Sequence, residues 1–411
     1  MKYLILLNRK FPYKSGEAFL ENEIDEISCN FDKIIIYPSD VSIHDKQTRN
    51  INSKNVEAHI LEENSLKSRK TKYMLCAPKY ILEKSSAKNI KEKAFESYFL
   101  AAAHSQANAI IKDLEKINFK KRDKIYLYSY WLYINAKVAC ILKDYFEKKG
   151  LKVVVFSRAH RFDIYKENHK LGYIPQRKEL LENLNHVFAC SDNGAQYLRG
   201  NYPKYKEKIS TGYLGTYDRG KSPRKANDKF RIVSCSRLSE VKRVNLIIEA
   251  LSNLKDANLN LSWTHLGGGE LYEQLKEEAS SKLNWMEVNM PGQMSNTDVY
   301  NHYLNNRVNL FINVSSSEGL PVSIMEATSF EIPVIATDVG GTSEIVIEGE
   351  NGYLLRENFK PEELSELIKK IAAMNKTEYK KKRKNARKIW ETNYQAKVNY
   401  EKFSNEILKM K

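Results

Sequence analysis

The 411-residue chain has few cysteines, and none of them stands in a metal-binding or redox spacing. The five are far apart, at Cys29, Cys76, Cys140, Cys190 and Cys235. This scatter excludes the C-x-x-C motifs of zinc sites and thioredoxin-like enzymes. An odd, scattered set of thiols is typical of a reducing compartment, so the sequence predicts a cytoplasmic protein without disulfides.

Long apolar runs are also missing. No stretch reaches the roughly 18 apolar residues that a membrane-spanning helix needs. Near the N-terminus the apolar run Tyr3–Leu7 is too short for the core of a signal peptide, so residues 2–8 predict a buried strand instead. There is no low-complexity tract or short repeat, and 42% of the residues are apolar, as in an ordinary globular protein.

Acidic residues are too few to balance the basic ones, and the formal charge is +16. A strongly basic chain attracts an anionic partner, such as nucleic acid, an acidic lipid surface or a phosphorylated substrate. Solubility alone explains the charge equally well. No helix-turn-helix, zinc-finger or aromatic RNA-binding signature is present, so we expect no nucleic-acid partner.

Short apolar runs rich in β-branched residues alternate with helical patterns, and the series occurs twice. In the first half we expect strands at 2–8, 32–38, 123–130, 152–158 and 186–191, with helices at 15–28 and 135–150. In the second half we expect strands at 230–236, 259–267, 308–315 and 332–338, with helices at 243–255, 270–283 and 361–374. Continuous apolar runs indicate parallel strands buried on both faces. The pattern predicts two doubly wound α/β domains.

A polar segment with glycine and proline, residues 217–229, separates the two series and predicts a linker. We therefore expect a first domain at 1–220 and a second at 221–388. Residues 389–411 are predicted to form a C-terminal helix that returns to the first domain.

The stretch "SSSEGLPVSIME" places Glu318 before a predicted helix and Glu326 within it. Pro321 suits the first helical position. The free N–H groups near such a helix start form an anion site, and Gly319 lets a ligand approach. Carboxylates beside an anion site favour hydroxyl groups as partners. Together they predict a nucleotide sugar as ligand. In the alternative interpretation, Glu318 only stabilises the helix dipole and Glu326 is solvated.

Further candidates follow the other strands of the second half. Arg237 and Lys242 come after residues 230–236, and two cations there can neutralise a diphosphate leaving group. After the next strand, Gly267 begins a turn of three glycines. This turn is not a dinucleotide-binding fingerprint, because the third glycine position of that motif is not a glycine here. Gly292 and Gln293 are possible partners of a base.

These motifs, "SRLSEVK", "LGGGEL", "PGQ", "EGLPVSIME" and "ATDVGGTSEIV", together resemble the family 4 retaining glycosyltransferases. The resemblance implies the GT-B fold, in which two Rossmann-like domains face a central cleft. It implies that Arg237 and Lys242 hold the donor diphosphate, Glu326 binds the ribose and Glu318 contacts the donor sugar. The remaining donor-binding candidates of this motif are Gly319, Leu320, Pro321 and Val322. No metal and no cofactor are expected.

The first half resembles this family more loosely. In "NRKFPYKSGEAFLENEI", Gly16 is the candidate to approach the donor phosphates. In "VVVFSRAHRFDIYKEN", the resemblance gives His160 a role in contacting or positioning the donor sugar. Asp163 is a candidate either to orient His160 or to bind the acceptor, and Arg158 is a candidate for acceptor binding. The alternative for His160 is packing at a sheet edge.

The expected reaction is sugar transfer from a UDP- or GDP-sugar to a hydroxyl of a glycan or lipid-linked acceptor, with retention of configuration. His160, Glu318, Arg237 and Lys242 are the catalytic candidates. Capsule, O-antigen or similar polysaccharide biosynthesis is the expected setting. The acceptor would be chosen by loops expected at 9–20 and 60–110.

An anionic membrane surface is a further possible partner, for instance of the basic run 380–388. A nucleotide-sugar 2-epimerase is the alternative within this fold, and a basic nucleic-acid-binding protein is a distant one.

Overall fold

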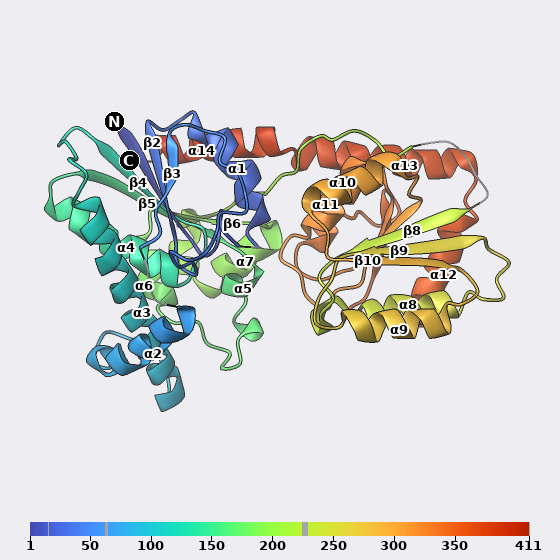
Figure 1. Cartoon of the computed structure of the whole chain (residues 1–411), viewed down its shortest axis with the longest axis horizontal. Coiled ribbons are helices and arrows are strands. Elements are labelled where there is room, and N and C mark those ends of the chain that lie inside the picture. Colours follow the sequence, from blue (N-terminus) through green and yellow to red (C-terminus); the bar gives the residue numbers. More distant parts are fainter. Residues whose placement is uncertain (15, 62–64, 224–228, 411) are drawn as a thin grey trace. The chain divides into compact units, whose positions relative to one another are not determined.

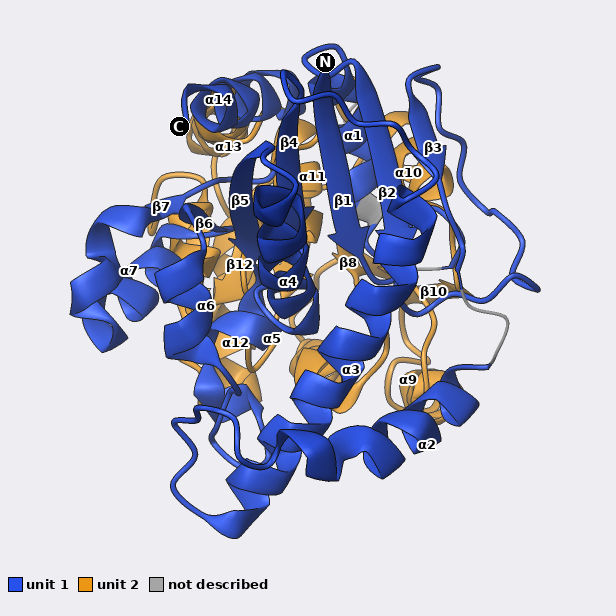
Figure 2. Ribbon diagram, turned by 90° about the vertical axis from the view of Figure 1, so that its left-hand side faces the viewer, with its two compact units in different colours: residues 1–214, 396–411 blue, residues 215–395 orange. Residues whose placement is uncertain are grey.

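A computed structural model describes the chain except residues 15, 62–64, 224–228 and 411 (Figure 1). The chain divides into two compact units, Met1–Leu214 with Ala396–Lys411 as unit 1, and Gly215–Gln395 as unit 2 (Figure 2). The sequence-based boundaries lay at 220/221 and 388/389. In the structure the boundaries lie at 214/215 and 395/396. Thr216 belongs to unit 2 because it forms a bridge to Gln395 and accepts a 2.7 Å hydrogen bond from the indole of Trp390. Residues 224–228 of the predicted linker lie outside the described part.

Unit 1 contains a seven-stranded parallel sheet with the order β3-β2-β1-β4-β5-β6-β7. The strand order reverses between β1 and β4. Central strands are buried on both faces, which explains their continuous apolar sequences. The strands are β1 (Lys2–Asn8), β2 (Lys33–Pro38), β3 (Val56–Ala58), β4 (Lys124–Ser129), β5 (Lys152–Ala159), β6 (His186–Ala189) and β7 (Ile209–Thr211).

Helices cover both faces of this sheet (Figure 2). They are α1 (Ala18–Ser28), α2 (Leu66–Cys76), α3 (Ile90–Leu114), α4 (Ile134–Lys148), α5 (Arg161–Ile164), α6 (Arg177–Asn183), α7 (Asp192–Asn201) and α14 (Ala396–Lys409), with 3-10 turns η1 (Ala77–Tyr80), η2 (Lys166–Asn168) and η3 (Pro203–Lys208). The expectation of loops at 60–110 is wrong, since α2 and most of α3 lie there. Because α3 buries five consecutive residues, 99–103, it lacks a clear helical period in the sequence.

Unit 2 contains a six-stranded parallel sheet with the order β10-β9-β8-β11-β12-β13. Its strands are β8 (Phe230–Cys235), β9 (Leu261–Leu266), β10 (Glu287–Gly292), β11 (Leu310–Asn313), β12 (Val334–Thr337) and β13 (Gly352–Leu355). Its helices are α8 (Val244–Ser252), α9 (Tyr272–Lys282), α10 (Asn296–Asn305), α11 (Val322–Ser329), α12 (Pro361–Ala372) and α13 (Lys376–Asn393), with 3-10 turns η4 (Glu240–Lys242) and η5 (Thr342–Glu344).

The two sheets share one topology, because the order of unit 2 also reverses, between β8 and β11. All strands expected from the sequence are present, and the prediction of two doubly wound α/β domains is confirmed. Four strands were not recognised in the sequence. β3, β7 and β13 are short, and β10 has the largely polar, proline-containing sequence EVNMPG. Pro321 caps α11 and lies one position before the helix rather than in its first turn.

Candidate functional site

The candidate residues of unit 2 gather at the carboxyl ends of its strands. Arg237 and Lys242 follow β8, Gly267 follows β9, Gly292 ends β10, and Glu318 follows β11. Since β8 and β11 are neighbours at the reversal of strand order, their loops flank the position where doubly wound sheets bind ligands. The fold therefore brings together residues that are up to 81 positions apart in the chain.

Glycines hold the loop after β9 against the loop after β8. A Cβ atom on Gly267 would lie 2.1 Å from the carbonyl oxygen of Ser236, and one on Gly269 would lie 2.3 Å from that of Leu238. The N–H of Leu238 donates to the carbonyl of Gly268 at 2.9 Å. These contacts explain the "GGG" motif by loop packing, and they fix the backbone of the β8 loop.

Gly292 and Gln293 lie at the edge of this group. Gly292 has a φ of 83°, which is left-handed backbone, and its carbonyl accepts the N–H of Gly267 at 3.1 Å. The exposed side chain of Gln293 donates only to the carbonyl of its neighbour Met294. Its amide group is therefore free to turn toward a ligand.

Lys242 and Glu318 form an ion pair, with 2.6 Å between Nζ and Oε1. Asn313, at the end of β11, donates to the same oxygen at 3.2 Å. The two loops are joined by the N–H of Ser316, which donates to the carbonyl of Val241 at 2.8 Å. Sequence reasoning found both charged residues but not their pairing, and it missed Asn313, whose position at a strand end was the available signal.

Several backbone donors stand beside this pair. Among the described residues, the N–H groups of Leu320, Val322 and Ser323 have no acceptor, as is usual where a helix begins. The turn after β12 supports this segment, because a Cβ atom on Gly340 would lie 2.0 Å from the carbonyl oxygen of Glu318. A lysine next to unpaired N–H groups is an anion-binding arrangement.

Glu326 lies inside α11 and is buried. The hydroxyl of Tyr300, on α10, donates to its Oε1 at 2.9 Å. Burial raises the pKa of Glu326 to about 7, and the bond from Tyr300 opposes this shift only in part. The second carboxylate oxygen can accept a further hydrogen bond, which hydroxyl donors would provide. Sequence reasoning missed Tyr300.

The side chain of Arg237 is exposed. Its Nε lies 2.9 Å from a carboxylate oxygen of Glu270, and the two side chains are 74% and 51% exposed. An exposed ion pair of this kind contributes little to stability. The guanidinium can therefore leave Glu270 for another anion at small cost.

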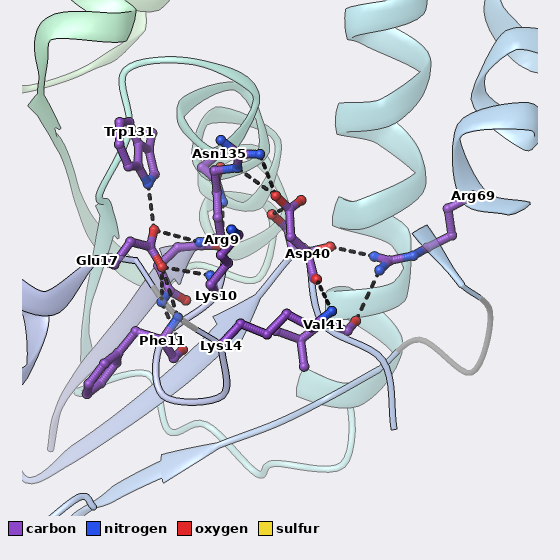
Figure 3. Close-up of polar contacts among 12 residues, drawn as sticks. Arg9, Lys10, Phe11, Lys14, Glu17, Asp40, Val41, Arg69, Trp131 and Asn135 are labelled. Atoms are coloured by element: carbon purple, nitrogen blue, oxygen red, sulfur yellow. Dashed lines mark hydrogen bonds and ion pairs between the residues drawn. The ribbon is translucent and has the colours of Figure 1, made fainter. Parts of the chain in front are cut away.

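In unit 1 the loop after β1 is organised by the carboxylate of Glu17 (Figure 3). It accepts hydrogen bonds from the N–H groups of Arg9, Lys10 and Phe11 at 2.7–2.9 Å, and from the indole of Trp131 at 2.6 Å. Gly16, before it, has a φ of 102°. Gly16 thus lies exposed in a turn whose shape depends on Glu17, a residue that sequence reasoning did not select.

A pocket with a cavity volume of about 160 Å³ lies beside this loop in unit 1. Its aromatic lining residues are Tyr73, Tyr98, Trp131, Tyr133 and Phe162, and its charged ones are Arg9, Asp40 and Lys70. Arg9 and Asp40 are paired at 2.6 Å, and Arg69 fastens α2 to the end of β2 by donating to Val41 at 3.1 Å (Figure 3). Aromatic walls with polar ends suit a ring-bearing polar ligand.

His160 follows β5 and is buried against the rings of Tyr130 and Trp131, with centroids at 4.7 and 4.9 Å. Burial lowers the pKa of His160 to about 3, and Arg158 adds to the effect. Its Nε2 has no partner among the described residues. The imidazole is therefore neutral near pH 7, and one ring nitrogen remains unused.

Of the two roles predicted for Asp163, the structure supports orientation of His160 and not acceptor binding. Its carboxylate is fully buried, where it accepts the N–H groups of His160 at 2.5 Å and Leu132 at 2.6 Å. Burial raises its pKa to about 7. Asp163 therefore holds the turn that carries His160 and does not reach a ligand.

Arg158 needs the same correction. It is fully buried, as is Glu23 on α1, and Nε lies 3.0 Å from the Glu23 carboxylate. The guanidinium also donates to the carbonyl of Gly212 at 2.6 Å and lies 4.0 Å from the ring centre of Phe403 on α14. Arg158 is a structural residue that joins three parts of unit 1.

Residues 218–389 match the family model described as glycosyl transferases group 1. The O-antigen biosynthesis glycosyltransferase WbnH of Escherichia coli is 35% identical over 127 residues, covering 31% of this chain and 33% of that protein. The GtfA subunit of a UDP-N-acetylglucosamine–peptide N-acetylglucosaminyltransferase of Streptococcus pneumoniae is 22% identical, covering 50% of this chain and 41% of its own length. The chain spans between 30% and 50% of the length of these curated relatives.

Solved structures match the whole chain. The lipopolysaccharide outer core galactosyltransferase WaaB has a TM-score of 0.66 at 15% identity, with 99% of each chain covered. Anabaena HepE in complex with UDP has a TM-score of 0.67 at 14% identity, with 99% of this chain and 100% of that chain covered. These matches confirm the GT-B fold. Among the described residues, no helix is long and apolar enough to cross a membrane.

Proposed function

We propose that this protein is a family 4 retaining glycosyltransferase that moves a sugar from a UDP- or GDP-sugar to a hydroxyl of a glycan or lipid-linked acceptor. The observation that carries the proposal is the Lys242–Glu318 pair beside the unpaired N–H groups of α11, at the strand reversal of unit 2. Its setting would be the assembly of a cell-surface polysaccharide; WbnH is named for O-antigen biosynthesis.

The donor diphosphate would lie between Lys242, Arg237 and the start of α11. In the transfer, the bond between the anomeric carbon and the diphosphate oxygen breaks and a bond to the acceptor oxygen forms, while the acceptor hydroxyl gives its proton to the leaving diphosphate oxygen. Negative charge grows on the leaving diphosphate, and preorganised cations and N–H groups lower the energy of that state. Because these groups supply the charge that a metal would supply, we propose a reaction without a metal cofactor.

A carboxylate next to a diphosphate would repel it, and the ion pair explains how Glu318 can stand there. Lys242 neutralises Oε1, and Asn313 donates to the same atom, so Oε2 remains to accept a hydrogen bond from a sugar hydroxyl. Glu326 would accept from the ribose with the oxygen that Tyr300 leaves unoccupied.

His160 is assigned to positioning the donor sugar rather than to proton transfer. A histidine whose pKa lies near 3 holds too little proton at pH 7 to act as an acid. Its Nε2 has no partner among the described residues but is buried, so it would form a hydrogen bond to a donor hydroxyl only after the side chains that cover it move aside. Gly16 is proposed to let the first loop of unit 1 approach the donor phosphates.

The test is a panel of UDP- and GDP-sugars. We expect one donor to raise the melting temperature of the full chain, as ligand binding to the native state requires. The same donor should then be consumed in the presence of an acceptor glycan, with an α-linked donor giving an α-linked product. Unchanged turnover in both Arg237→Ala and Glu326→Ala would contradict the proposal. Conversion of the donor without any acceptor would identify an epimerase instead.

A further inference from the structure

Residues 66–91 of unit 1, which comprise α2, η1 and the beginning of α3, are unusually basic. They contain eight Lys or Arg residues and a single acidic residue, Glu83, so this short segment carries a net charge of +7 out of +16 for the chain. α2 lies at the lower end of unit 1 in Figure 1. We call residues 66–91 the α2 surface.

The α2 surface also exposes large apolar side chains. Leu82 is 94% exposed, Ile90 88% and Leu75 77%, with Met74 and Ile81 at 59% and 48%. These are five of the eleven large apolar side chains that are exposed in the described residues. Single exposed apolar residues are ordinary, but a cluster ringed by charges marks an interaction surface.

The fold fixes this exposure. On α2, Arg69 and Tyr73 are buried, and Arg69 donates to the carbonyl of Val41 at 3.1 Å. Because these two side chains hold one face of the helix against unit 1, Met74 and Leu75 stay on the other face. They cannot be buried by rotating the helix.

The other basic run of the chain, residues 380–388, is built differently. Lys382, Arg383 and Arg387 are buried and bind within unit 2, to the carbonyls of Gly349 and Ser222 and to the carboxylate of Asp218. No large apolar side chain of α13 is exposed. Three of the seven basic residues in this run therefore serve the fold. Of the two basic runs, the α2 surface is the one that combines exposed lysines with exposed large apolar side chains.

We propose that the α2 surface docks on an anionic lipid bilayer. Leu75, Leu82 and Ile90 would enter the interfacial region, and the surrounding lysines would pair with lipid phosphates. Leu66, Lys70 and Tyr73 of the same helix line the aromatic pocket, so docking would bring that pocket to the membrane surface. The role of the pocket in receiving a lipid-linked acceptor rests on the proposed function. The docking of the α2 surface on a bilayer does not.

The test is sedimentation of the full chain with vesicles of phosphatidylcholine, alone or in equal parts with phosphatidylglycerol. We expect binding to the mixed vesicles only, and weaker binding as salt is added, since screening shortens the reach of the charges. Leu75→Ser combined with Leu82→Ser and Ile90→Ser should reduce the bound fraction about tenfold or more, because three inserted apolar side chains are lost.

A charge-matched pair of variants separates the surface from net charge. Lys67→Gln, Lys72→Gln, Lys79→Gln and Lys88→Gln together should release the protein from mixed vesicles. Four Lys→Gln substitutions on α13, at the exposed residues Lys380, Lys381, Lys384 and Lys388, should leave vesicle binding unchanged. Equal losses in the two variants would overturn the proposal.

Other occupants give other results. Absence of vesicle binding, together with a dimer in light scattering that the three serine substitutions dissolve, would assign the α2 surface to a second copy of the chain and overturn the proposal. Release from mixed vesicles by duplex DNA, with tight DNA binding at the same lysines, would also overturn it. Donor binding in unit 2 is measured in parallel: its loss refutes the proposed function, whereas loss of vesicle binding alone refutes only the docking.

Discussion

The two units of this protein have the same strand topology but build their sites from different materials. In unit 2 the candidate site consists of short loops locked together by glycines and backbone hydrogen bonds. In unit 1 the corresponding edge of the sheet carries long helical insertions, aromatic side chains and a carboxylate hub at Glu17. Only unit 2 contains the segment that matches the family model. The proposed donor site depends on backbone geometry, and a sequence motif records that geometry. The proposed acceptor site depends on side chains, which no sequence motif of this chain records.

The largest effect is expected from the ion pair of unit 2. Lys242→Ala should lower kcat by about two to three orders of magnitude, which is typical for the loss of a group that stabilises developing charge. Lys282→Ala is the matched control, because Lys282 lies in the same unit and pairs with Glu278 in an exposed ion pair. Equal turnover in wild type and Lys242→Ala would show that backbone donors suffice.

The next effect tests the corrected role of Arg158. Arg158→Met leaves Glu23 buried without its cation, and breaking such a pair costs about 3–5 kcal/mol. We expect the unfolding transition of unit 1 to fall to lower denaturant concentration, with nucleotide binding by unit 2 unchanged. A variant of native stability that has lost only its acceptor turnover would restore the acceptor role.

A smaller effect is expected from the glycine packing of unit 2. Gly267→Ala forces a Cβ atom to 2.1 Å from the carbonyl of Ser236 and adds strain at a φ of 140°. We expect a destabilisation of about 1–3 kcal/mol and weaker donor binding, measured by calorimetry. Gly200→Ala is the control, since its Cβ would meet no atom within 4 Å and its φ is not positive. Equal donor affinity in Gly267→Ala and Gly200→Ala would show that loop packing is not the reason for the "GGG" motif.

The smallest effect concerns pH. Burial raises the pKa of Glu326 from 4.5 to about 7, so between these values the native state holds a proton that the unfolded state has lost. Stability contributed by this group is therefore present below about pH 4.5 and falls as the pH rises toward 7. Glu326→Gln should flatten that part of the stability profile. The pKa of Asp163 is raised as well, so Asp163 contributes to the pH dependence of both proteins. The quantity to measure is therefore the difference between the stability–pH profiles of the wild type and Glu326→Gln. Identical slopes would contradict the shift.

The sequence predicted most of the fold because buried parallel strands leave continuous apolar runs, as in β1 and β4. It did not predict α3, whose consecutive buried residues 99–103 hide the helical period. In unit 2, charged residues at strand ends identified Lys242 and Glu318, since strand ends converge in this topology. Their partners Asn313 and Tyr300 are ordinary polar residues whose importance depends on distances across the fold. For the same reason Arg158, which follows a strand as an active-site residue would, could not be recognised as a core residue.

The helix α14 gives the chain an order of assembly. Unit 1 is interrupted at Leu214 and resumes at Ala396, and α14 closes over Arg158 with Phe403. Asn30 and Lys124 of the first segment also bind this helix, at Ser404 and at the carbonyl of Met410. During synthesis, the whole of unit 2 leaves the ribosome before unit 1 can bury its own ion pair. We therefore expect unit 2 to reach its native state first and unit 1 to remain open until the final helix is made.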